Sequence, residues 1–189
     1  MVGGIDSRVV FTIIVALVAA ERIFELVLSE RNARRTLGRG GIEHSEPIHW
    51  LVVVLHTLWI VAAPFEVWLF DRPWIPLLAG VCIVLLVAGM ILRYWAVTTL
   101  GDRWNTRIIT VPGEKRVTAG PFRFFRHPNY VAVYEEMFAL PLLHGAWLTA
   151  AILGTVNSVV ILIKARAEDK ALGRLPEEGG QQKLSEDMP

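Results

Sequence analysis

The chain has 189 residues, 53% of them hydrophobic, and a formal net charge of +1. Soluble domains contain about 45–50% apolar residues even when glycine is counted, whereas the value here leaves glycine out. A soluble fold of this size would expose much of that apolar surface, so we expect an integral membrane protein. The near-neutral charge gives no reason to expect a nucleic-acid partner. The lone cysteine, Cys82, excludes an intramolecular disulfide and a zinc site made of several cysteines.

The first apolar run extends from Val9 to Leu28 and carries three charged residues, Glu21, Arg22 and Glu25, in its last turns. Glu21 and Glu25 share one face of a helix, and Arg22 can pair with Glu25 three residues further on. Two placements remain open for these charges. They lie near the membrane interface and pack against other helices, or they line a cavity.

A polar connection, residues 29–47, follows with four arginines and three glycines, which should end any helix there. The second apolar run, Trp50 to Phe70, is preceded by His49 and contains His56. The two histidines would share a helix face, but two ligands at that spacing are too few for a metal site. We expect them to form hydrogen bonds with a neighbouring helix.

The third apolar run, Trp74 to Thr98, has Arg93 close to its end, next to Tyr94 and Trp95. Basic and aromatic residues at the end of a span are ordinary interface anchors. Alternatively Arg93 faces a functional site, because it lies eight residues before a segment, residues 101–108, that we discuss below.

A long polar connection runs from Leu100 to Asn129 before the last two apolar segments. Residues 130–143 are mostly apolar but too few for an independent span. A turn at residues 144–146 leads into the last span, residues 147–163. We expect the two segments to form a helical hairpin, which would also give Glu135 and Glu136 somewhere other than lipid to face.

Lysine and arginine are distributed unequally along the chain. Four follow the first span, six lie in the connection after the third, and five lie in the tail, whereas only Arg8 and Arg72 lie in the alternate segments. Five transmembrane helices satisfy the positive-inside rule, with the C-terminus and the long connection facing the cytoplasm. We expect residues 1–98 to form three helices, residues 99–175 to carry the site, and residues 176–189 to be a disordered tail.

The most distinctive segment is Gly-Pro-Phe-Arg-Phe-Phe-Arg-His-Pro-Asn-Tyr, residues 120–130. Its two prolines lack a backbone N–H and bias the residues before them away from helix. Free backbone groups should therefore occur where two arginines and a histidine gather. In a membrane protein, irregular backbone is tolerated only where protein covers it or where it lines a polar cavity. The segment predicts a site.

This segment resembles the signature of the isoprenylcysteine carboxyl methyltransferase family, Gly-Pro-Tyr-Arg, two variable residues, then Arg-His-Pro-x-Tyr. Residues 101–108 are similar to the segment that precedes it in bacterial members, and residues 166–172 resemble the family's closing Arg-x-Glu-Glu helix. The likeness covers roughly residues 92–172. It departs from the pattern at Phe122, where a tyrosine is usual, and at Asp169, where a glutamate is usual.

The resemblance implies a methyltransferase of the bacterial cytoplasmic membrane that takes a methyl group from S-adenosyl-L-methionine. With the orientation given above, its cofactor pocket would face the cytoplasm. The methyl group would go to an oxygen, carboxylate or phenol, of a lipophilic acceptor such as an isoprenoid or a lipid. The expected cofactor-binding residues are Arg126, His127, Pro128, Tyr130, Glu168 and Asp169. The expected catalytic residues are Arg166 and Glu168, and the expected acceptor-binding residues are Arg93, Trp104, Asn105 and Glu135.

Other functions remain open for the same residues. Arg123 and Arg126 could meet phospholipid head groups, with His127 an ordinary interfacial histidine. The chain would then be a non-catalytic membrane module; another alternative is a related reductase using a nicotinamide cofactor. No Gly-x-Gly-x-x-Gly occurs, so a Rossmann-type enzyme has no support.

Overall fold

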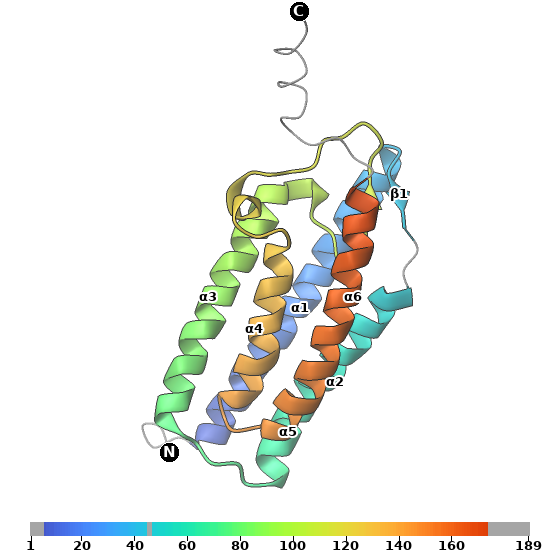
Figure 1. Cartoon of the computed structure of the whole chain (residues 1–189). Helices are drawn as coiled ribbons and strands as arrows, with labels where there is room; N and C mark the ends of the chain where they lie inside the picture. Colours follow the sequence, from blue (N-terminus) through green and yellow to red (C-terminus); the bar gives the residue numbers. More distant parts are fainter. Residues whose placement is uncertain (1–5, 45–46, 174–189) are drawn as a thin grey trace, which may run out of the picture.

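A computed structural model describes residues 6–44 and 47–173 as a bundle of long helices (Figure 1). The helices are α1 (Ser7–Gly38), α2 (Pro47–Leu69), α3 (Pro76–Leu100), α4 (Pro128–Leu142), α5 (Trp147–Thr149) and α6 (Thr155–Leu172), with a π-helical turn, η3 (Ala150–Gly154), joining the last two. Short 3₁₀ turns, η1 (Gly101–Arg103) and η2 (Gly120–Arg123), lie in the long connection. The strands β1 (Ile42–Glu43) and β2 (Ile109–Thr110) pair antiparallel, with Ile42 opposite Thr110.

Within residues 6–44 and 47–173, three helical stretches are long and apolar enough to cross a membrane: Ile48–Leu69, Pro76–Arg103 and Trp147–Leu172. At 1.5 Å per residue, about 20 residues cover the roughly 30 Å of hydrocarbon. Large apolar side chains such as Leu77 and Val84 are exposed along α3, as expected for a surface that faces lipid. The prediction of a helical bundle with helices able to span a membrane is confirmed in its coarse form. The count of five spans stays a prediction, as does the division at residue 98, and residues 176–189 lie outside the described part.

The expected hairpin is present, because α4 and the α5–η3–α6 rod run antiparallel on either side of a short turn (Figure 1). Gly154 permits close packing, since a Cβ there would lie 2.9 Å from the ring of Phe138. On its other side, α4 packs on α3 at Gly89, where a Cβ would lie 3.6 Å from the Ala132 carbonyl oxygen. The helix α4 therefore contacts α3 on one side and the α5–η3–α6 rod on the other, and only the contact at Gly154 is too close for a Cβ.

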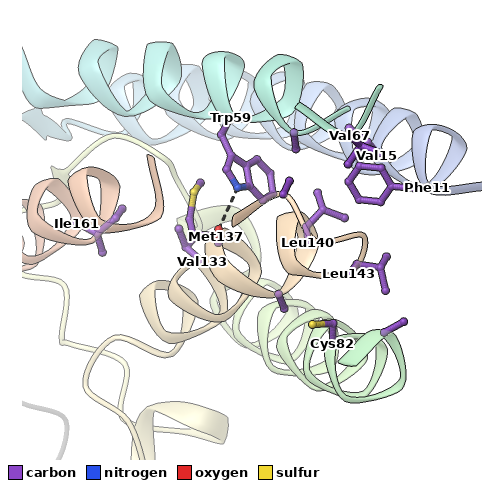
Figure 2. Close-up of a cluster of buried hydrophobic side chains, with 14 residues drawn as sticks. Phe11, Val15, Trp59, Val67, Cys82, Val133, Met137, Leu140, Leu143 and Ile161 are labelled. Atoms are coloured by element: carbon purple, nitrogen blue, oxygen red, sulfur yellow. Dashed lines mark hydrogen bonds between the residues drawn. The ribbon is translucent and has the colours of Figure 1, made fainter. Parts of the chain in front are cut away.

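The apolar core gathers around α4 (Figure 2). Pro141 lies inside this helix and has no N–H to donate to the carbonyl of Met137, four residues earlier. The indole Nε1–H of Trp59 in α2 donates to that carbonyl instead, at 3.1 Å, as the dashed line in Figure 2 shows. The proline therefore removes one hydrogen bond within α4, and a hydrogen bond from Trp59 of α2 takes its place.

The end of the bundle at which α1 begins is closed by ionic contacts. The Glu66 carboxylate of α2 accepts hydrogen bonds from the backbone N–H groups of Leu148 and Thr149, at 3.0 and 2.7 Å, and so caps the start of α5. Arg72 pairs with Glu66 at 2.8 Å, and Arg8 pairs with Asp71 in the same α2–α3 turn. The two arginines that the sequence assigned to the sparsely charged side thus lie at one end of the bundle.

Candidate active site

The connection after α3 is held against α1, which continues past its apolar run to Gly38. Ser29 and Asn32 are buried on one face of this extension. The Ser29 hydroxyl donates to Asn105 Oδ1 and accepts from the backbone N–H of Thr106, both at 2.9 Å, and Asn32 Nδ2 donates to the carbonyl of Trp104 at 2.9 Å. These bonds fix the segment that carries two of the predicted acceptor-binding residues.

The predicted cofactor segment meets the end of α6. Tyr130 donates its hydroxyl proton to Glu168, and His127 Nε2 lies 3.0 Å from Asp169 Oδ1. Arg126 Nε donates to the same Asp169 oxygen at 2.6 Å. We call these five side chains the motif–α6 cluster. Residues from two distant parts of the sequence therefore form one polar group.

Local sequence explains the shape of the motif half of this cluster. Pro128 is buried and occupies the first turn of α4, where a missing N–H costs nothing. The preceding residue, His127, lies outside the helix, as the proline requires. The rings of His127 and Tyr130 stack with centroids 5.3 Å apart. The segment thus presents aromatic surface, a histidine and an arginine beside two carboxylates.

The main cavity lies next to this cluster and has a volume of about 280 Å³. Apolar side chains of α1 and α2, including Ile23 and Val53, line much of it, and α4, α6 and the connection contribute polar groups. Tyr130 lines this cavity while its hydroxyl contacts Glu168. An apolar space thus borders the motif–α6 cluster.

A second, smaller pocket of about 130 Å³ lies among the connection, the motif and α6, with Arg126 and Glu168 in its wall. Asn105 lines both this pocket and the main cavity. The polar pocket and the apolar cavity therefore share a wall, and the motif–α6 cluster reaches both.

A buried ionic network connects the main cavity with the bundle interior. Arg93, only 2% exposed, pairs with Glu136 of α4 at 2.5 Å and with Glu25 of α1 at 3.4 Å. Arg22 pairs with Glu25 at 2.9 Å, which confirms the predicted i,i+3 pair. Arg22, Glu25 and Arg93 all line the main cavity. Arg22 and Glu25 therefore combine both expected placements, because they pair with residues of other helices and also line the cavity.

The structure brings most of the predicted site residues together. Arg93, Trp104 and Asn105 line the main cavity. Glu135 does not line either space, because its carboxylate lies against Gly89 of α3. Arg166 is exposed, lines neither space, and forms no hydrogen bond or ion pair with the described residues.

Sequence reasoning missed Lys164. This lysine of α6 is 4% exposed, lines the main cavity, and donates from Nζ to the Thr106 carbonyl at 2.6 Å. It lies four residues before Glu168 and so shares a helix face with it, whereas Arg166 does not. That spacing is the signal by which the sequence could have indicated it.

The histidines of α2 differ from expectation. His56 Nδ1 lies 2.8 Å from the carbonyl of Val52 in its own helix, so the expected bond to a neighbouring helix is wrong for this residue. Its imidazole lines the main cavity, as does His49. Within the described ranges, no group of three or more His, Cys, Asp or Glu side chains could hold a metal ion.

The residues of this site lie within a region of the chain that matches a known protein family. The sequence model of the isoprenylcysteine carboxyl methyltransferase family matches residues 82–174, which include the connection, the motif and the described part of α6. The chain is 33% identical over 162 residues to the uncharacterized protein YpbQ of Bacillus subtilis, covering 86% of this chain and 96% of the relative. It is 21% identical over 161 residues to an uncharacterized protein of Haemophilus influenzae, covering 85% and 93%.

Proposed function

Because the chain belongs to the isoprenylcysteine carboxyl methyltransferase family, we propose that it transfers a methyl group from S-adenosyl-L-methionine to an oxygen of a lipophilic acceptor. Family membership points to a membrane methyltransferase. The finer parts of the proposal are the cofactor, the oxygen nucleophile and the acceptor class. The observation that carries them is the motif–α6 cluster at the boundary between a polar pocket and an apolar cavity.

The donor set of the cluster suits the proposed cofactor. Glu168 and Asp169 offer carboxylate oxygens to an ammonium group or to ribose hydroxyls, and the stacked rings of His127 and Tyr130 offer an aromatic face. When bound, S-adenosylmethionine supplies a methyl group activated by its positively charged sulfur. The ion pair between Arg126 and Asp169 is partly exposed and therefore adds little to stability. Its role would be to orient the Asp169 carboxylate toward the cofactor.

The main cavity suits a lipophilic acceptor. Part of its lining consists of apolar side chains of α1 and α2, such as Ile23, Leu26 and Val53. An acyl or isoprenoid tail entering between these helices would lie against those side chains after leaving the lipid. Tyr130, Asn105 and Lys164 lie in the wall of the same cavity and can orient the acceptor's oxygen. Most of the rate would come from this positioning, which can supply roughly 7–11 kcal/mol.

We assign the orienting cation to Lys164 rather than to Arg166. Lys164 is buried in the cavity wall, where an ammonium donates strongly to an anionic oxygen, whereas Arg166 is exposed. A carboxylate acceptor is already ionised at neutral pH and needs no base. A phenol needs one, and Glu168 and His127 are the candidates in the cluster.

The distribution of arginines between the two ends of the bundle supports an orientation of the protein in the membrane. Arg8 and Arg72 lie at the end of the bundle opposite the motif–α6 cluster, and the arginine-rich segments lie at the cluster's end. The positive-inside rule then places the cluster on the cytoplasmic side of a bacterial membrane, where a soluble cofactor is available.

Equilibrium binding to the purified protein in lipid nanodiscs tests the cofactor. S-adenosylmethionine should bind and NADPH should not. Tyr130→Phe removes the donor to Glu168 and should weaken binding by about 1–3 kcal/mol. Tyr134→Phe is the matched control, because Tyr134 lies on the same helix with an exposed side chain. Binding of NADPH alone would indicate a reductase, and binding of neither would indicate a non-catalytic module.

Methyl incorporation into organic-soluble product tests the acceptor side, with radiolabelled S-adenosylmethionine and a bacterial lipid extract. Lys164→Met should lower incorporation while cofactor affinity stays close to that of the parent protein. Arg166→Met should change neither quantity. The reverse pattern would return the orienting role to Arg166.

A further inference from the structure

Two arginines of the motif have different surroundings although they are three residues apart. Arg126 pairs with Asp169. Arg123 is exposed and has no carboxylate partner among the described residues. The rings that follow it are also exposed, Phe124 by 70% and Phe125 by 44%. Two large exposed rings beside a cation are unusual for a surface that faces only water.

The structure sets the height of these rings relative to α3. Gly120 has a φ of +59°, and a Cβ there would lie 2.5 Å from the hydroxyl oxygen of Thr99, so η2 is seated directly on the last turns of α3. The ring of Phe124 packs on Trp95 of α3, with centroids 6.3 Å apart. The exposed ring of Phe124 therefore lies level with Trp95.

That level corresponds to the edge of a bilayer. Trp95 lies 19 residues beyond Pro76, the first residue of α3, which is about 28 Å along a helix. The hydrocarbon core is about 30 Å thick. Trp95 is itself 45% exposed, so the lipid-facing surface of α3 continues without a break onto Phe124.

We propose that residues 123–125 are an interfacial anchor that binds the phospholipid surface. Phe124 and Phe125 lie at the boundary between acyl chains and head groups, where aromatic side chains are favoured. The Arg123 guanidinium binds lipid phosphate through charge-assisted hydrogen bonds. Since Arg126 and His127 follow directly, the membrane surface then holds the segment that forms the motif–α6 cluster. This binding surface does not depend on which reaction the cluster performs.

Site-directed spin labelling in phosphatidylcholine nanodiscs tests the anchor. With the buried Cys82 replaced by alanine, single cysteines are introduced as Phe124→Cys, Val84→Cys and Pro112→Cys. Val84 is an exposed residue of the α3 span, and Pro112 lies in an exposed turn of the connection. The relative accessibility to oxygen and to a water-soluble nickel chelate reports the depth of each label.

The label at position 124 should lie between the other two, more accessible to oxygen than the label at 112 and less than that at 84. Adding Arg123→Gln should shift the label at 124 toward water. Accessibility at 124 equal to that at 112 would overturn the anchor and leave these rings for a protein partner or a second copy of the chain. An unchanged depth in the Arg123→Gln variant would overturn the role of the guanidinium.

Discussion

Replacing Trp59 with phenylalanine should destabilise the protein mainly because of a proline in another helix. Trp59 is 1% exposed, and its indole N–H is the donor that Pro141 cannot supply to the Met137 carbonyl. Phenylalanine keeps an aromatic ring in the core but leaves that carbonyl without a partner. A buried acceptor left unpaired costs about 1–3 kcal/mol, and hydrogen bonds measured in membrane proteins average about 0.6 kcal/mol.

A double-mutant cycle separates this hydrogen bond from the smaller volume of phenylalanine. In a Pro141→Ala background, residue 141 gains an N–H that can bond the Met137 carbonyl within α4. Trp59→Phe should then cost less than in the parent by about 0.6–3 kcal/mol. The loss of indole volume occurs in both backgrounds and cancels in the cycle.

Unfolding in mixed micelles of increasing denaturing detergent, followed by circular dichroism at 222 nm, measures the four free energies without using tryptophan fluorescence. Equal costs of Trp59→Phe in the two backgrounds, within about 0.3–0.5 kcal/mol, would show that Trp59 acts by packing alone. The compensation between α2 and α4 would then be refuted.

Three further predictions concern charged groups. Arg93→Met should destabilise by about 3–5 kcal/mol, because the buried carboxylates of Glu25 and Glu136 are then left with Arg22 as their shared cation. Adding Glu136→Gln should recover part of that loss in the same unfolding assay. Burial lowers the pKa of His144 below its usual 6.5. Its contribution to stability is therefore present above pH 6.5 and is lost as the pH falls toward the folded-state pKa. In the His144→Gln variant, the unfolding midpoint should change less with pH between pH 5 and 7 than in the parent protein. Glu66→Gln should lower stability by about 1 kcal/mol through a weaker cap on α5, and hydrogen exchange of the Thr149 amide should speed up.

Much of the architecture was predictable because it depends on local composition. The runs that became α2, α3 and the α5–α6 rod are long and apolar, and a turn at His144 predicted the hairpin. The motif was recognisable because Pro128 fixes the start of α4 and leaves the residues before it outside a helix. The Arg22–Glu25 pair followed from helix spacing alone.

The side-chain partners across helices depended on the tertiary structure. The sequence favoured Arg166, but the rotation of α6 turns Lys164 into the cavity and leaves Arg166 exposed. It named Glu135 for the acceptor, whereas α4 directs Glu136 toward Arg93. It named Arg126 for the cofactor and left phospholipid binding open for both Arg123 and Arg126, whereas in the structure only Arg126 pairs with Asp169.

The physical reason is that spacing along one helix determines which residues share a face, but not the direction in which that face points. That direction is set by the packing of each helix against its neighbours, through contacts such as Gly89 with α4 and Gly154 with Phe138. The chain by itself therefore indicated the long apolar helices, the hairpin and the segments that form the candidate site. Only the packed bundle decided which cation faces the cavity, which carboxylates meet the motif, and which arginine of the motif pairs with a carboxylate.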